Sequence, residues 1–118
     1  MITINVVKLI GSSSLLSSNK GITLYEELNN FLKEHRQITL DFFGSEYLST
    51  IFINHSLGQL CVDMGWDITK FYEHFNIINI SEEHQASIEL AISNAYHRYN
   101  LIAQKLDPKE YYSSTCSY

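Results

Sequence analysis

The side chains that could do chemistry in this sequence gather where a short apolar run gives way to a helix. Ser49 and Thr50 are adjacent hydroxyls at the predicted start of that helix, and the carboxylates Asp41 and Glu46 flank the turn before it. His55 follows on the same helix. A hydroxyl activated by a nearby imidazole is the nucleophile of many hydrolases and transferases. One interpretation of this stretch is therefore a small enzyme that uses Ser49 or His55.

A helix cap is the simpler interpretation of Ser49. Serine is a preferred residue just before a helix, where its oxygen accepts a hydrogen bond from a backbone N–H of the first turn. For Ser49 the donor would be Ile51 or Phe52. The same position suits a phosphoserine, because free N–H groups at a helix start stabilise a phosphate. Capping and phosphorylation are compatible roles for this hydroxyl.

The other titratable residues give little support for catalysis. Asp41 lies inside a predicted strand, and we expect it to accept hydrogen bonds from the neighbouring loop, which would lower its pKa. Metal sites need closely spaced ligands, such as H-x-x-x-H or C-x-x-C pairs. No such pair occurs among the two cysteines and the five histidines, which are His35, His55, His74, His84 and His97. The sequence predicts no catalytic set, no metal site and no cofactor.

A strand, a turn and a helix position these residues. Residues 38–43 are rich in β-branched and aromatic side chains and predict a strand buried on both faces. Gly44 and Ser45 break the run before the helix. Because loops beyond the carboxyl ends of strands usually carry the ligand or partner in α/β folds, we place the working surface at residues 44–52. The predicted helix has a buried stripe of Ile53, Leu57, Leu60, Cys61 and Met64, and it ends at Gly65.

Strands and helices alternate along the rest of the chain, which implies a mixed or parallel sheet covered by helices. We expect a strand over residues 2–10 and then a loop over 11–20, with or without a short strand at Leu15 and Leu16. A helix follows, capped by Thr23 and Glu26, and its buried stripe is Leu24, Leu28, Phe31 and Leu32. After a strand over 76–80, the last helix is capped by Ser81 and runs to about residue 104, with the buried stripe Ile88, Ala91, Ile92, Ala95, Tyr99 and Ile102.

The connection over residues 65–75 is rich in aromatic side chains. Asp67 can cap a short helix there. Trp66, Phe71, Tyr72 and Phe75 either pack under the edge of the sheet as core or form an exposed patch for a partner or a second copy of the chain. Trp and Tyr are enriched at binding hot spots, so Trp66, Phe71 and Tyr72 are candidates for a second interface.

A length of 118 residues predicts a single domain. The net charge of -5 and the scattered basic residues exclude an electrostatic footprint for nucleic acid. We expect no membrane span, because no stretch approaches the ~20 apolar residues that a span needs, and no signal peptide, because the N-terminus lacks a basic region. Cys61 and Cys116 are predicted to be free thiols, which fits the cytoplasm.

Several short motifs, in this order and spacing, resemble the STAS-like domain family labelled DUF4325. They are Gly21, Leu40-Asp41-Phe42, Ser49-Thr50 with Phe52, Gly58 with Leu60, and Ile78-Asn79-Ile80-Ser81. The resemblance implies an α/β fold with one STAS-like domain over residues 1–106 and a flexible tail over 107–118. It implies a mixed sheet of four or five strands with helices mainly on one face, as in anti-sigma factor antagonists.

The resemblance also implies a function, that of a non-catalytic regulatory module that binds a protein. In the antagonist branch a kinase with a histidine-kinase-like (GHKL-type) ATPase fold phosphorylates serine in a D-S-S-G turn. The similar turn here is Leu48-Ser49-Thr50-Ile51, in which Ser49 aligns with the phospho-acceptor and the Asp and the Gly are absent. We expect the partner to dock on the turn and helix of residues 44–64. The expected contact or phosphorylation residues are Glu46, Ser49, Thr50 and Phe52.

Two other hypotheses stay open beside this one. The first is the small enzyme with Ser49 or His55 described above. The second is a protein encoded by a phage or mobile element whose acidic surface blocks a host protein. A bacterial or phage origin fits both the regulatory and the inhibitory hypothesis. A homodimer is a further possible assembly for the regulatory module.

Overall fold

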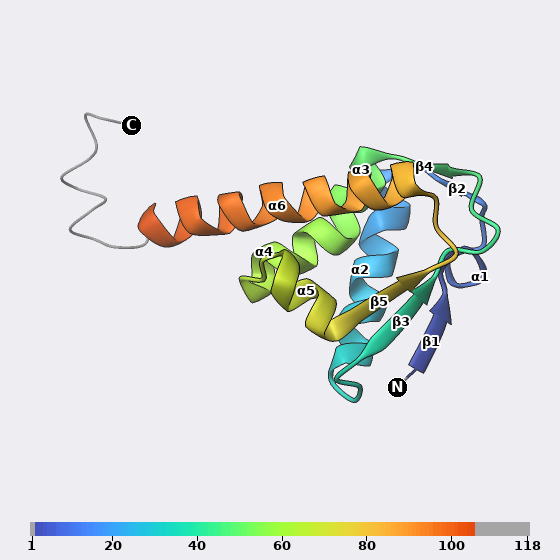
Figure 1. The fold of residues 1–118 in the computed structure, drawn as a ribbon, viewed down its shortest axis with the longest axis horizontal. Coiled ribbons are helices and arrows are strands. Elements are labelled where there is room, and N and C mark those ends of the chain that lie inside the picture. The colour runs from blue at the N-terminus through green and yellow to red at the C-terminus, as the bar shows by residue number, and fades with distance from the viewer. Residues whose placement is uncertain (1, 106–118) are drawn as a thin grey trace.

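The computed structural model describes residues 2–105, and their side chains up to residue 103. Strands and helices alternate as predicted, and the α/β class is confirmed (Figure 1). The elements are β1 (Ile2–Asn5), α1 (Val6–Ile10), β2 (Ser14–Leu15), α2 (Ser18–Leu32), β3 (Ile38–Asp41), β4 (Tyr47–Leu48), α3 (Thr50–Ile53), the π-helix η1 (Asn54–Gly58), α4 (Gln59–Met64), α5 (Ile68–His74), β5 (Phe75–Ile78) and α6 (Glu82–Lys105).

The strands form two small parallel sheets instead of one mixed sheet of four or five strands. The larger sheet has the order β1-β3-β5, so the predicted central strand is indeed interior. The smaller sheet pairs β2 with β4, Ser14 with Tyr47 and Leu15 with Leu48. β2 and β4 have two residues each, too few to extend the larger sheet. All the pairings among the described residues are parallel.

The first predicted strand is only half as long as expected, because a short helix replaces its second half. The side chain of Asn5 accepts a hydrogen bond from the backbone N–H of Lys8 at 2.8 Å and caps α1. Gly11 ends α1 in the left-handed conformation with φ of 80°. The apolar run after Asn5 fits a buried strand or a buried helix equally well, and the cap decides for the helix.

The helix predicted to begin at Thr23 begins five residues earlier, at Ser18, so the Thr23–Glu26 capping box was wrong. Ser17 is the cap, and its hydroxyl accepts from the N–H of Lys20 at 3.2 Å. Thr23 lies inside the helix and donates its hydroxyl hydrogen to the carbonyl oxygen of Asn19. Leu24 and Leu28 are buried as predicted, and Phe31 and Leu32 are partly buried.

The predicted second helix consists of three consecutive helical segments, α3, the π-helix η1 and α4. Ser56, inside this turn, is fully buried and donates to the carbonyl oxygen of Phe52 at 2.8 Å. Gly65 ends the run with φ of 68°, as predicted. The buried stripe is confirmed for Ile53, Leu57, Leu60 and Cys61, whereas Met64 is exposed.

The core lies on one face of the β1-β3-β5 sheet. Side chains alternate along each strand, so Ile4, Leu40 and Ile77 share a face in register. Figure 1 shows α2 passing behind the strands and α4, α5 and α6 along the β5 side. The buried cluster is completed by Leu24 and Leu28 of α2, Leu57 of η1, Leu60 of α4, and Ile88 and Ile92 of α6.

The N-caps predicted for the last two helices, α5 and α6, are confirmed. Asp67 caps α5 through the N–H of Lys70, and Ser81 accepts from the N–H of His84 before α6. Ile88, Ala91, Ile92 and Ala95 are buried, but Tyr99 and Ile102 are exposed, because the end of α6 projects beyond the body (Figure 1). The predicted tail over residues 107–118, including Cys116, lies outside the described residues. Within the described part, no helix is both long and apolar enough to cross a membrane.

Candidate functional site

The turn before Ser49 is held by the serine-rich loop far upstream in the sequence. The β2–β4 pairing brings residues 13–15 beside residues 46–48. The hydroxyl of Ser13 donates to Glu46 Oε1 at 2.9 Å, and the backbone N–H of Glu46 donates to the carbonyl oxygen of Ser13 at the same distance. Glu46 therefore braces the turn from an exposed position.

Ser49 is the N-cap of α3, as predicted. Its Oγ accepts a hydrogen bond from the backbone N–H of Phe52 at 3.0 Å. The structure adds a second bond, which the sequence did not suggest: Ser49 donates its hydroxyl hydrogen to the carbonyl oxygen of Leu16 at 2.8 Å. The hydroxyl is thus engaged as both donor and acceptor, and it is half-buried.

The two neighbouring candidates differ sharply in exposure. Thr50 is exposed at the first residue of α3. Phe52 is fully buried, so its side chain supports the helix start from beneath and is not presented to a partner, contrary to expectation. Thr50 is therefore the more exposed of the two hydroxyl-bearing residues, and Ser49 is half-buried.

Ser49 and His55 each point their hydrogen at a backbone carbonyl oxygen. His55 Nδ1 lies 2.9 Å from the carbonyl oxygen of Ile51, an acceptor, so Nδ1 carries the hydrogen and donates. Ser49 donates to Leu16. A nucleophile and base need a hydrogen bond to one another. These contacts use both groups to stabilise the helix start instead.

The carboxyl end of the larger sheet carries a polar cluster with one residue from each strand end. Asp41 Oδ1 accepts from the N–H of Phe43 and from the side-chain amide of Asn79, each at 2.9 Å. The amide of Asn5 donates to the carbonyl oxygen of Phe43 at 3.4 Å. The bond from Asn79, followed by that from Phe43, holds the pKa of Asp41 below its usual range, as predicted.

Sequence reasoning identified Asp41 in this cluster but missed its two amide partners. Asn79 has a positive φ of 56°, which asparagine tolerates better than most residues. An asparagine just after a predicted strand was the available signal. Together Asp41, Asn5 and Asn79 fix the path of the chain into the turn at Gly44.

Large apolar side chains are exposed around Ser49. Tyr47 is 58 % exposed, Ile51 is 55 % exposed and Leu16 is 47 % exposed. Tyr47 and Ile51 are each two positions from Ser49 in the sequence, and Leu16 is hydrogen-bonded to Ser49. We call the group Leu16, Tyr47, Ser49, Thr50 and Ile51 the Ser49 surface. Phe43, at the start of the turn, is 70 % exposed.

Comparison with known proteins decides the family. The family described as "STAS-like domain of unknown function (DUF4325)" matches residues 20–85, which include the turn and α3. The chain belongs to this STAS-like family. No curated protein and no solved structure matches it.

The aromatic connection of this STAS-like domain is mostly core. Phe71 and Phe75 are fully buried, which removes Phe71 from the candidate second interface. Trp66 is partly buried and stacks on the imidazole of His74, with ring centroids 4.4 Å apart and planes 8° apart. Tyr72 is exposed and donates its hydroxyl hydrogen to Glu89 of α6 at 2.7 Å. Desolvation, with Glu89 as a further contributor, raises the pKa of Tyr72.

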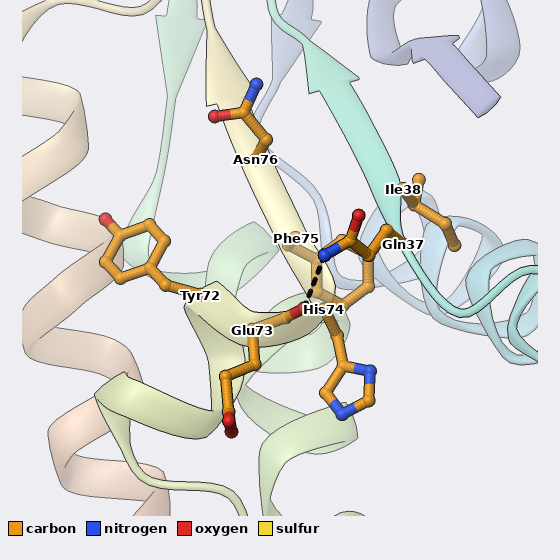
Figure 2. A pocket seen from close by; sticks show the side chains of 7 residues that line it. All are labelled: Gln37, Ile38, Tyr72, Glu73, His74, Phe75 and Asn76. Carbon is orange, nitrogen blue, oxygen red and sulfur yellow. Dashed lines mark hydrogen bonds between the residues drawn. The ribbon is translucent and has the colours of Figure 1, made fainter. Parts of the chain in front are cut away.

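Several hollows in the described part of the STAS-like domain lie at the opposite end of the sheet from the Ser49 surface. One, of about 150 Å³, opens where β3 and β5 begin, and Gln37 spans it by donating to the carbonyl oxygen of Glu73 at 3.4 Å (Figure 2). Figure 2 shows the side chains of Tyr72, His74 and Asn76 pointing away from one another. A wider hollow nearby is lined by Arg36, Trp66 and His74, among others.

These hollows contain none of the residues predicted to do chemistry. No group of three or more His, Cys, Asp or Glu side chains within residues 2–103 is arranged to hold a metal ion. The Ser49 surface offers contacts of a different kind, since its side chains project outward around a capped helix start.

Proposed function

We propose that this STAS-like domain is a non-catalytic regulatory module that binds a protein partner through the Ser49 surface. One observation carries the proposal: Leu16, Tyr47 and Ile51 are exposed apolar side chains gathered around one hydroxyl-bearing helix start. Contiguous apolar exposure on a small protein is typical of interaction sites. Tyrosine is also enriched among the residues that dominate binding energy.

The rigidity of this surface favours binding as well. Leu16 is tied to Ser49 through its carbonyl oxygen, and the β2–β4 pairing fixes Tyr47. Glu46 is braced by Ser13. A surface ordered before binding loses less conformational entropy when the partner docks. These contacts therefore support docking without a large rearrangement.

For the partner we propose a protein with a histidine-kinase-like ATPase fold, as implied by the likeness to anti-sigma factor antagonists. Its phosphoryl group would go to a hydroxyl at the start of α3. Thr50 is the exposed hydroxyl, whereas Ser49 must first give up its bond to Leu16. A phosphate there would add about two negative charges beside an apolar contact and weaken docking. The unpaired, buried Cys61 favours a reducing compartment, and we propose the cytoplasm.

The test compares two exposed apolar residues of similar size. Ile51→Ser removes an apolar side chain from the Ser49 surface, and Leu90→Ser does the same on α6, where Leu90 is 63 % exposed. A purified protein with a histidine-kinase-like ATPase fold serves as the candidate partner, and its affinity for the wild type and for each variant is measured by calorimetry. We expect Ile51→Ser to weaken binding at least about tenfold, as hot-spot truncations do, and Leu90→Ser to bind as wild type.

The opposite pattern, loss with Leu90→Ser and retention with Ile51→Ser, would move the docking site to α6. Wild-type affinity of both variants for the partner would show that the Ser49 surface does not bind it. Circular dichroism of both variants checks that each is folded.

A further inference from the structure

Among residues 2–105, no strand pairs with the outer edge of β1. In the order β1-β3-β5, β1 is a terminal strand, and its four residues pair on one side with β3. Figure 1 shows β1 at the margin of the molecule, with no element beyond its far side. The backbone groups along that side are therefore open to a further strand.

One apolar row on the core face is less buried at β1 than at β3 and β5, whereas the next row, Ile4, Leu40 and Ile77, is buried at β1 and only partly buried at β5. Ile2, Ile38 and Phe75 are aligned across the sheet and share its core face. Ile38 and Phe75 are 0 % and 2 % exposed, whereas Ile2 is only partly buried. The row is closed at β5 and in the centre, and it is open at β1. One more apolar side chain on the far side of Ile2 would close it.

β1 also lacks the usual protection against strand addition. Natural edge strands are often blocked by lysine, proline or a bulge. Residues 2–5 are Ile-Thr-Ile-Asn, without proline or charge, and their register with β3 is unbroken at four successive positions. The shortness of the strand limits the strength of pairing but does not prevent it.

We propose that two copies of this chain associate by antiparallel pairing of their β1 strands, with Thr3 opposite Thr3 of the partner copy. Side chains that face each other across an antiparallel pair lie on the same face of the sheet. With Thr3 at the two-fold axis, Ile2 of each copy faces Ile4 of the other on the core side. The strand is self-complementary in this register, and the pairing places an apolar side chain beside each partly buried Ile2.

The assembly is a six-stranded sheet, with the helices of both copies on the same face. Its interface is small, because only a few residues of each copy pair. Interfaces below about 1,200 Å² are typical of weak, transient complexes. The dimer therefore forms in a concentration-dependent manner and coexists with monomer.

Charge at Thr3 tests this arrangement. Thr3 is exposed in the monomer, so Lys or Glu at this position is compatible with its fold. Facing side chains at the axis would have Cβ atoms about 5 Å apart, so two lysines or two glutamates repel, and one of each attracts. We measure the dissociation constants of wild type, Thr3→Lys, Thr3→Glu and the control Thr3→Val by sedimentation equilibrium from micromolar to millimolar concentration.

The expected result is a wild-type dimer that Thr3→Val preserves and that each charged variant weakens about fivefold, the effect of a like-charge pair. An equimolar mixture of Thr3→Lys and Thr3→Glu should restore association. A wild type that stays monomeric at every concentration overturns the proposal, and so does a dimer that both charged variants leave unchanged.

Hydrogen exchange provides a test that does not depend on variants. Successive amides of a strand point to opposite sides, so those of the Ile2, Thr3 and Ile4 amides that point away from β3 should become protected as the wild-type concentration rises. Protection of β1 that is the same at all concentrations, beside a dimer seen by sedimentation, would place the interface elsewhere. This measurement decides the matter if a charged variant fails to fold.

Discussion

The hydroxyl of Ser49 donates to the carbonyl oxygen of Leu16 at 2.8 Å while it accepts from the N–H of Phe52 at 3.0 Å. One side chain thereby joins the chain just after β2 to the start of α3, although Leu16 and Ser49 are 33 residues apart in the sequence. The cap stabilises the helix, and the second bond fixes the serine-rich loop against it. The Ser49 surface depends on both.

Ser49→Ala is expected to lower the free energy of unfolding by about 1–2 kcal/mol, because it removes the cap and leaves the Leu16 carbonyl oxygen without its hydroxyl donor. Ser49→Asp keeps a capping oxygen but has no hydrogen for Leu16. It should therefore also be less stable than wild type, although a cap alone would predict equal stability. Urea unfolding of both variants is the measurement. Wild-type stability of Ser49→Asp would show that the Leu16 bond contributes nothing.

Asp41→Asn should remove part of the acid sensitivity of the fold. The bonds from Asn79 and Phe43 lower the pKa of Asp41 from 3.8. A lowered pKa in the folded state stabilises the protein fully above the unfolded value, and this contribution disappears as the pH falls through the folded value. The melting temperature of wild type should therefore drop more steeply than that of Asp41→Asn as the pH falls below about 4. Parallel profiles for the two proteins would contradict this role.

Cys61 should react with thiol reagents only after unfolding. It is fully buried, and desolvation raises the pKa of its thiol to about 12, so the reactive thiolate is scarce. In a Cys116→Ser background Cys61 is the remaining cysteine of the chain. Its labelling by an aromatic disulfide should be slow in buffer and rapid in denaturant. Fast labelling in buffer would mean that α4 opens readily.

Trp66→Ala should destabilise the domain without changing its association. Trp66 is partly buried, stacks on His74 and meets Phe75 edge-on, with centroids 6.2 Å apart. Truncation of a buried aromatic side chain costs about 3–5 kcal/mol, and partial burial reduces that to about 1–3 kcal/mol. Melting temperature and sedimentation are measured together. A change in sedimentation at unchanged melting temperature would assign Trp66 to an interface instead.

Local signals in the sequence were sufficient for most of the helix boundaries near the site. The Ser49, Asp67 and Ser81 caps and the Gly65 end were predicted correctly, because each depends on a few adjacent residues. The partner of Asp41 could not be predicted in the same way. Asn79 is 38 residues away, and only the parallel pairing of β3 with β5 brings the two side chains together.

The errors arose where two local signals compete and a distant contact decides. Both Ser17 and Thr23 are good caps, but a helix that starts at Thr23 would leave Gly21 outside it. In the structure Gly21 lies inside α2 and is buried against α3. This close packing of two helices depends on tertiary contacts, which the sequence pattern around Thr23 does not contain.

Gly21 gives the sharpest test of that packing. A Cβ at residue 21 would lie 2.7 Å from the carbonyl oxygen of Phe52 and 3.0 Å from the Cβ of His55. Alanine favours a helix over glycine by about 1 kcal/mol, but contact with backbone cannot be relieved by a side-chain rotation. Gly21→Ala should therefore lower the free energy of unfolding by about 1–3 kcal/mol, as overpacking does.

The control for Gly21→Ala is Asn30→Ala, an exposed position of the same helix. There the gain in helix propensity acts without a clash, so the free energy of unfolding should rise by a few tenths of a kcal/mol. Urea unfolding of the two variants gives opposite signs if α2 packs on Phe52 as described. If Gly21→Ala also stabilises the protein, α2 and α3 are further apart than described, and packing at Gly21 does not determine where α2 lies.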